Sequence, residues 1–174
     1  MTEPYRRTAE QRAGDFAEAR AWEEQLAEVF GPNVITRFDS TSEMDIWVPG
    51  YYIEAKEKKQ VYTKRWHRLP GVEEPDLFII DELTVRRAAE KYPAAFFVLR
   101  DRPTSRLFFA PIWELISCER VRVNRDKKGK WILDIRNFRQ ILDEHEIPEL
   151  APLLLADIGW RLSPAQTQLE VPQA

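Results

Sequence analysis

One stretch of this 174-residue chain has the pattern of two short β-strands joined by a tight turn. Apolar and polar residues alternate along 44–48 and again along 51–56, on either side of Pro49-Gly50. Proline and glycine favour turns, and successive side chains of a strand point to opposite faces of the sheet. The sequence therefore predicts a β-hairpin with two apolar cross-strand pairs: Val48 with Tyr51, and Ile46 with Ile53. One face of this hairpin would be apolar throughout: Met44, Ile46, Val48, Tyr51, Ile53 and Ala55.

The other face of the predicted hairpin brings two carboxylates together. In this register Asp45 lies directly opposite Glu54; a three-residue loop would shift that pairing, but Glu54 and Lys56 share a face in either case. Directly opposed residues have Cβ atoms roughly 5 Å apart, a separation at which two carboxylates repel each other. A divalent metal ion between them would relieve the repulsion, with Lys56 as a neighbouring positive charge. The alternative is that all three are solvated charges on an open sheet face.

A helix upstream of the hairpin supplies a third carboxylate. Apolar residues at helical spacing predict a helix over 8–30 that Gly31-Pro32 ends. Phe16 is the first of the apolar residues at this spacing, and the others form the predicted buried stripe: Ala19, Trp22, Leu26, Val29 and Phe30. On a helical wheel Glu23 borders that stripe, whereas Glu24 points nearly the opposite way, into solvent. Glu23 can therefore reach a site at the margin of the sheet, although an ordinary flanking charge would have the same pattern.

The remaining pattern predicts one α/β domain over residues 1–162, with a central mixed β-sheet flanked by helices and an extra C-terminal hairpin and helices. The expected strands are 34–38, 77–80, 94–99 and 106–110, and the hairpin is 119–123 with 130–135. The expected helices are 83–92, 111–116, 137–145 and 149–158, the last capped by Gly159. Residues 163–174 are polar and contain prolines, which predicts a disordered tail.

Composition limits the possible chemistry. No apolar run approaches the ~20 residues of a membrane helix and no signal peptide is evident, so we expect a cytoplasmic protein without membrane contact. Cys118 is the single cysteine, and His67 and His145 are the only histidines, so disulfides and cysteine or histidine metal sites are not expected. Any metal would then be held by oxygen ligands, which favours Mg²⁺ or Mn²⁺.

Basic residues gather in the middle of an acidic chain. The net charge is −3 overall, but residues 35–140 carry +5, while the segments on either side are acidic. Cations and aromatics that could contact phosphates and bases follow the hairpin directly: Lys58, Lys59, Tyr62, Lys64, Arg65, Trp66 and Arg68. A second basic group lies around the later hairpin: Arg122, Arg125, Lys127, Lys128 and Lys130. The alternative for both groups is a solvated charged surface.

A helical glutamate, a strand aspartate and Glu-x-Lys on the next strand together resemble the PD-(D/E)xK nuclease superfamily, which has a restriction-endonuclease-like fold. The similarity covers roughly residues 16–110 and is greatest to Holliday-junction resolvases and RecB-like nuclease domains. It implies that Asp45, Glu54 and the carbonyl of Ala55 bind Mg²⁺ or Mn²⁺, assisted by Glu23, while Lys56 orients water or stabilises the transition state. It also implies a catalytic role for Gln60. Met44 stands where the family name has proline.

The function implied by this resemblance is a metal-dependent endonuclease that hydrolyses phosphodiester bonds of DNA, including branched or recombination and repair intermediates. One alternative is an exonuclease, a restriction-type enzyme or an RNA-cleaving nuclease of the same fold. Another is a non-catalytic nucleic-acid-binding module. A homodimer would suit a symmetric substrate, although the sequence contains no interface signature.

Overall fold

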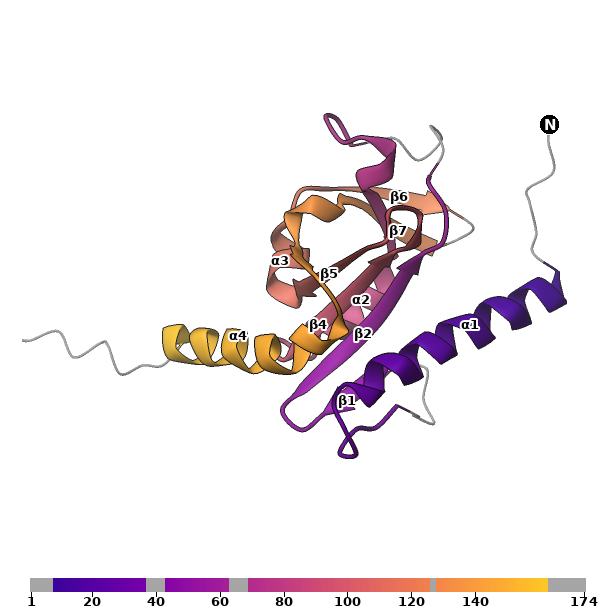
Figure 1. Ribbon diagram of the computed structural model, residues 1–174. Coiled ribbons are helices and arrows are strands. Elements are labelled where there is room, and N and C mark those ends of the chain that lie inside the picture. The colour runs from indigo at the N-terminus through magenta and orange to yellow at the C-terminus, as the bar shows by residue number, and fades with distance from the viewer. Residues whose placement is uncertain (1–7, 37–42, 63–68, 126–127, 163–174) are drawn as a thin grey trace, which may run out of the picture.

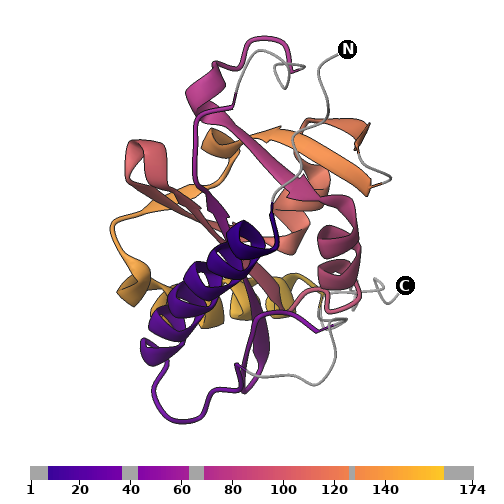
Figure 2. The ribbon, with the colours of Figure 1, turned by 90° about the vertical axis from the view of Figure 1, so that its right-hand side faces the viewer.

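A mixed five-stranded sheet forms the middle layer of the fold (Figures 1 and 2). The computed structural model describes residues 8–36, 43–62, 69–125 and 128–162. The sheet has the strand order β1 (Ile46–Val48), β2 (Tyr51–Lys58), β4 (Ala95–Asp101), β5 (Arg106–Pro111) and β8 (Arg139–Ile141). Strands β2 and β4 are parallel, and the other neighbours are antiparallel. A separate antiparallel sheet contains β3 (Leu77–Asp81), β7 (Lys128–Asp134) and β6 (Arg120–Arg125).

Four α-helices in the described ranges cover the two faces of the larger sheet. They are α1 (Ala9–Glu28), α2 (Glu82–Ala89), α3 (Ile112–Ser117) and α4 (Ile147–Leu162). Short 3-10 turns join the strands at η2 (Glu74–Asp76), η3 (Arg102–Thr104), η4 (Ile135–Asn137) and η5 (Glu144–Glu146). None of the helices in these ranges is both long and apolar enough to cross a bilayer.

The two faces of the larger sheet support two separate hydrophobic cores. On one face, Phe96 and Phe109 pack with Trp22 and Leu26 of α1 and with Ile147 of α4. On the opposite face, alternate residues of the same strands pack against α2, α3 and the smaller sheet: Phe97, Leu99, Phe108, Val85, Leu115 and Leu133. Strands β4 and β5 are therefore buried on both faces, and for this reason their sequences are nearly continuous apolar runs.

The predicted fold class is confirmed: one α/β domain has a mixed sheet flanked by helices. The first hairpin also has the predicted register, with Ile46 opposite Ile53 and Val48 opposite Tyr51. The later hairpin is not an appendage, because β7 pairs with β3 and completes the smaller sheet. The predicted tail at 163–174 lies outside the described residues.

Three local predictions are wrong. Residues 34–36 form only an isolated bridge between Ile35 and Trp47, and the rest of the expected first strand lies outside the described ranges. The expected helix 137–145 is instead η4, β8 and η5, because the side chains of Asp134 and Asp143 bond the backbone N–H groups of Arg136 and His145. Helix α4 continues past Gly159 to residue 162, since one glycine costs a helix only about 1 kcal/mol.

Two side chains depart from their predicted faces. Phe16, expected to pack in the core, is 74% exposed on α1. Met44 is buried, but in the core opposite to that of Ile46 and Ile53. It precedes β1, so the alternation of the strand does not extend to it.

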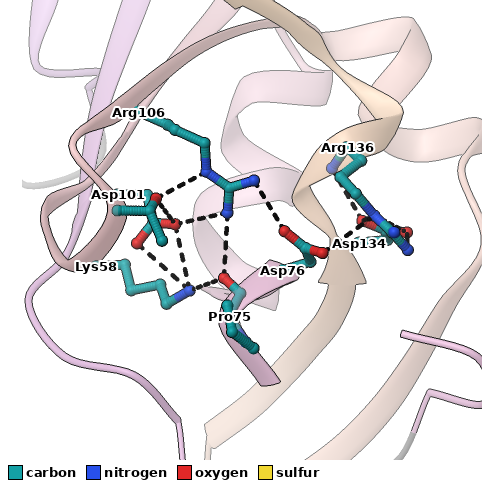
Figure 3. Close-up of polar contacts among 8 residues, drawn as sticks. Lys58, Pro75, Asp76, Asp101, Arg106, Asp134 and Arg136 are labelled. Carbon is teal, nitrogen blue, oxygen red and sulfur yellow. Dashed lines mark hydrogen bonds and ion pairs between the residues drawn. The ribbon is translucent and has the colours of Figure 1, made fainter. Parts of the chain in front are cut away.

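A row of charges joins β2, β4 and β5 at the interface between the sheets (Figure 3). Lys58 is opposite Asp101, and Asp101 is opposite Arg106, so the three side chains share one face. The Lys58 ammonium lies 3.4 Å from Asp101 Oδ1, and both side chains are fully buried. Arg106 donates to Asp101 Oδ2 at 3.0 Å and to Asp76 Oδ1 at 2.8 Å, and Lys58 also donates to the Pro75 carbonyl. The row therefore fixes the end of β2 to the segment that leads into β3.

We expect Lys58→Met to lower the free energy of unfolding by about 3 kcal/mol, because it leaves the buried Asp101 carboxylate without one of its two cations. The matched control is Lys59→Met at the next residue, where the ion pairs with Asp15 and Glu18 are partly exposed and worth about 1 kcal/mol or less. Urea unfolding of both variants measures the difference. Equal losses would show that burial does not distinguish the two lysines.

Candidate functional site

Three oxygen atoms of the first hairpin surround the ammonium group of Lys56. Its Nζ lies 2.5 Å from Glu54 Oε1 and 3.4 Å from Asp45 Oδ2. It also donates a hydrogen bond of 3.2 Å to the carbonyl oxygen of Ala55. The structure thus brings together the two carboxylates, the carbonyl and the lysine that the sequence predicted would form one site.

The edge of β2 explains why these groups meet. Strand β1 begins at Ile46, so β2 has no strand partner on that side beyond Ile53. The N–H group of Ala55 instead donates to Asp45 Oδ2 at 2.8 Å, which orients this carboxylate toward β2. Glu54 and Lys56 alternate with Ala55, so their side chains leave the strand on the face opposite to its methyl group.

Burial makes the charges of this site interact strongly. The Glu54 side chain is 8% exposed, and the Lys56 side chain is 31% exposed. Burial raises the pKa of Glu54 to about 7, with a contribution from Asp45 and with Lys56 opposing the change. Burial alone would lower the pKa of Lys56, but Glu54 and Asp45 outweigh it and hold this pKa above its ordinary value. The ammonium therefore stays charged at neutral pH.

Glu23 of α1 lies near enough for its charge to interact with Asp45 and Lys56, but it does not join Asp45 and Glu54 in a metal-binding group of side chains. It follows Trp22, which is buried against the sheet, and its own side chain is half-buried. Burial raises the pKa of Glu23 to about 7, and the charge of Asp45 adds to this rise while Lys56 opposes it. Glu24 is exposed, as the helical wheel predicted, and it pairs with Arg20 at 3.6 Å. Glu23 is thus the carboxylate of α1 whose electrostatic environment includes the hairpin.

The oxygen atoms of the site suit a hard divalent cation. Asp45, Glu54 and the Ala55 carbonyl already surround one positive charge, the Lys56 ammonium, and Mg²⁺ prefers such ligands. Within the described ranges, no three Asp, Glu, His or Cys side chains are grouped closely enough to hold a metal ion. A Mg²⁺ ion here would have two carboxylates and one carbonyl as its protein ligands, with water in the other coordination positions, as is common for this ion.

Three of the other predicted site residues, Lys59, Gln60 and Tyr62, line one cavity beside α1. Gln60 is exposed and lines this cavity of about 510 Å³ with Gln11, Asp15 and Glu18 of α1. Lys59 contacts α1 through ion pairs of 3.1 and 2.9 Å to Asp15 and Glu18.

The predicted basic surface is only partly present. Lys58 is fully buried, so its assignment to a nucleic-acid surface is wrong. The alternation of β2 turns the Lys58 side chain toward the interface between the two sheets. Only the packing of the sheets, which the sequence does not show, makes this face buried. Tyr62 is half-buried, with its pKa raised to about 12 by burial, and its ring lies 5.5 Å from the Lys58 ammonium. Lys64, Arg65, Trp66 and Arg68 lie outside the described residues.

The arginines of α2 are not among the residues predicted from the sequence. Arg86 and Arg87 line the same cavity as Arg122 and Lys128 of the later hairpin. Glu82 lies four residues before Arg86, a spacing that places both on one side of a helix, and this was the available signal. Arg86 and Arg87 lie beside the β6–β7 hairpin only because of how the two sheets pack.

Comparisons with known proteins identify no family for this chain. No protein-family model matches it, and no curated protein matches it. Among solved structures, a nuclease from a fusselovirus is similar with a TM-score of 0.44 and 11% identity, over 86% of this chain and 90% of that one. A match at this level assigns no activity, so the side-chain geometry has to carry the functional interpretation.

We expect Glu23→Gln to stabilise the protein in metal-free buffer at pH 8 by about 1 kcal/mol, after allowance for solvent screening. A carboxyl whose pKa is raised from 4.5 to about 7 binds its proton more tightly in the folded state, so stability falls as pH rises between these values. The gain should therefore disappear near pH 5. Urea unfolding at both pH values measures it, and Glu24→Gln is the exposed control. Destabilisation by Glu23→Gln at pH 8 would contradict the prediction.

Proposed function

We propose that this protein is a metal-dependent nuclease that hydrolyses phosphodiester bonds of DNA, with Mg²⁺ or Mn²⁺ as its cofactor. The observation that carries the proposal is the convergence of Asp45, Glu54 and the Ala55 carbonyl on one cationic position. Two carboxylates and a lysine at the rim of a sheet match the chemistry of phosphate hydrolysis, which needs a metal site next to a fixed positive charge.

Each residue of the site has a definite part in this proposal. Bound Mg²⁺ supplies polarisation of the phosphoryl oxygen and a more acidic water molecule. Asp45 and Glu54 provide the negative charge that holds the ion, and the N–H group of Ala55 keeps Asp45 oriented. Lys56 retains its proton and places a positive charge where the phosphorane gains negative charge.

Glu23 and Gln60 have supporting parts. A half-buried carboxylate with a pKa near 7 can accept a hydrogen bond from a water molecule and take up its proton at neutral pH. We propose that Glu23 binds water next to the metal ion. Gln60 lies exposed in the cavity beside α1, where an amide could contact the substrate strand.

Branched DNA, including recombination and repair intermediates, is our preferred substrate because of the resemblance of the Asp45–Lys56 segment to junction-resolving nucleases. Cleavage from DNA ends, sequence-specific cleavage and cleavage of RNA are the other activities that such a site could perform. A non-catalytic binding module is disfavoured by the intact set Asp45, Glu54 and Lys56, since loss of catalysis usually removes one of them. A homodimer would present two such sites to a symmetric junction.

We expect the protein to cut DNA in Mg²⁺ or Mn²⁺, and Lys56→Ala to reduce the rate at least about 100-fold through loss of transition-state stabilisation. The assay compares single-stranded, duplex and four-way-junction DNA and RNA on denaturing gels. Arg139→Ala, which removes an exposed cation from β8 at the opposite edge of the sheet, is the control. Failure to cut any substrate, or equal cleavage by Lys56→Ala, would refute the nuclease proposal.

We also expect millimolar Mg²⁺ or Mn²⁺ to raise the melting temperature, because an ion that binds only the folded state stabilises it. At ten times the dissociation constant the gain is about 1.4 kcal/mol, or roughly 3 °C for a chain of this size. Glu54→Gln should abolish the shift, while Glu24→Gln on the exposed side of α1 should keep it. Differential scanning calorimetry against an EDTA-treated reference without Mg²⁺ or Mn²⁺ measures the effect. A shift that persists in Glu54→Gln would place the ion elsewhere.

A further inference from the structure

A second charged cavity lies between α2 and the β6–β7 hairpin. It has a volume of about 530 Å³ and shares no lining residue with the candidate active site. Its charged lining residues are Asp81, Glu82, Arg86, Arg87, Arg122 and Lys128. Four basic and two acidic side chains give it a net charge of +2 on a protein whose total is −3. The cavity is therefore a local cationic site on an acidic molecule.

One buried carboxylate holds two of these arginines in place. Glu82 Oε1 accepts a 2.6 Å hydrogen bond from Arg86 Nη2, and Glu82 Oε2 accepts a 2.7 Å bond from Arg122 Nε. The Glu82 residue is 8% exposed, and its pKa is held below the ordinary value, first by its bond to Arg86. A helix residue and a hairpin residue are thus fixed side by side, although they are 36 positions apart in the sequence.

The backbone of β7 fits closely against this pair. Gly129 lies at the start of β7, and a Cβ atom there would overlap Glu82 Oε2 and lie 3.2 Å from Arg122 Nη2. Glycine at this position lets the hairpin close over the carboxylate. The position of the two guanidinium groups is therefore set by packing as well as by charge.

Both arginines remain largely exposed despite their contacts with Glu82. The Arg86 side chain is 70% exposed and the Arg122 side chain is 53% exposed, although each uses a donor on Glu82. A guanidinium group has five N–H donors in a rigid plane that matches the oxygens of a phosphate. Lys128, also exposed, adds a third positive charge to the same cavity.

From this arrangement we infer that the cavity binds the phosphodiester backbone of nucleic acid at a point separate from the candidate active site. The inference rests on the proposed function, because that function supplies a long polyanion as substrate. Several cations around one open cavity suit successive phosphates of a strand and carry no preference for base sequence. The cavity is then a positioning surface that holds the substrate while the hairpin site cuts it.

The test measures binding of a fluorescein-labelled DNA duplex by anisotropy in EDTA, where no cleavage occurs, over about 50–200 mM NaCl. The variant Arg122→Gln/Lys128→Gln removes two cations and keeps a donor near Glu82. We expect about tenfold or more weaker binding, and a salt dependence whose slope falls by about 2. Arg12→Gln/Arg139→Gln removes the same charge elsewhere and should change the affinity less than about threefold. If the double variant does not fold, Lys128→Glu against Arg139→Glu makes the same comparison.

The outcomes separate this inference from the nuclease proposal. Unchanged affinity and slope in Arg122→Gln/Lys128→Gln would overturn the cavity site, even if the wild-type protein cuts DNA. An equal loss in the Arg12→Gln/Arg139→Gln control would also overturn it, since only total charge would then matter. Weaker binding specific to the cavity variant supports the site, even for a wild-type protein that cuts nothing and so fails the nuclease test.

Discussion

The buried contact between Lys58 and Asp101 fixes the strand that carries the candidate active site. These residues are partners in the parallel pairing of β2 and β4, and Arg106 of β5 continues the row. Lys58, two residues after Lys56, lies on the same face of β2 as Glu54 and Lys56, but its ammonium group is fully buried. Because the row also contacts Pro75 and Asp76, the smaller sheet depends on the same interaction.

The candidate site holds both the two carboxylates of Asp45 and Glu54 and the Lys56 ammonium that neutralises part of their charge. Without Lys56, the half-buried Asp45 and the buried Glu54 would face each other with no positive charge between them. Burial already raises the pKa of Glu54 to about 7. The ammonium group relieves this repulsion from within the site. A metal ion entering the proposed position would compete with this lysine, so the same charge both stabilises the ion-free hairpin and lies where a phosphate would need it.

The sequence predicted the hairpin and its register because both depend on local alternation and turn chemistry. The paired strands β4 and β5 followed from apolar runs. The burial of Lys58 could not be predicted from the sequence, because its contacts are with Asp101 and Pro75, which are far away in the chain. The region 137–145 was misread because aspartate side chains interrupt a helical pattern. Tertiary packing, which local patterns do not contain, decided those cases.

The backbone of Ala55 contributes to the candidate site, and its side chain contributes to the core under α1. Its N–H group and carbonyl face the open edge of β2 and contact Asp45 and Lys56, while its methyl group lies 7% exposed in the core shared with Trp22 and Leu26. Enlarging this one small side chain would wedge the first helix away from the sheet without altering a single charge. Glu23 would move with that helix, so its distance from the two hairpin carboxylates depends on the volume of one methyl group.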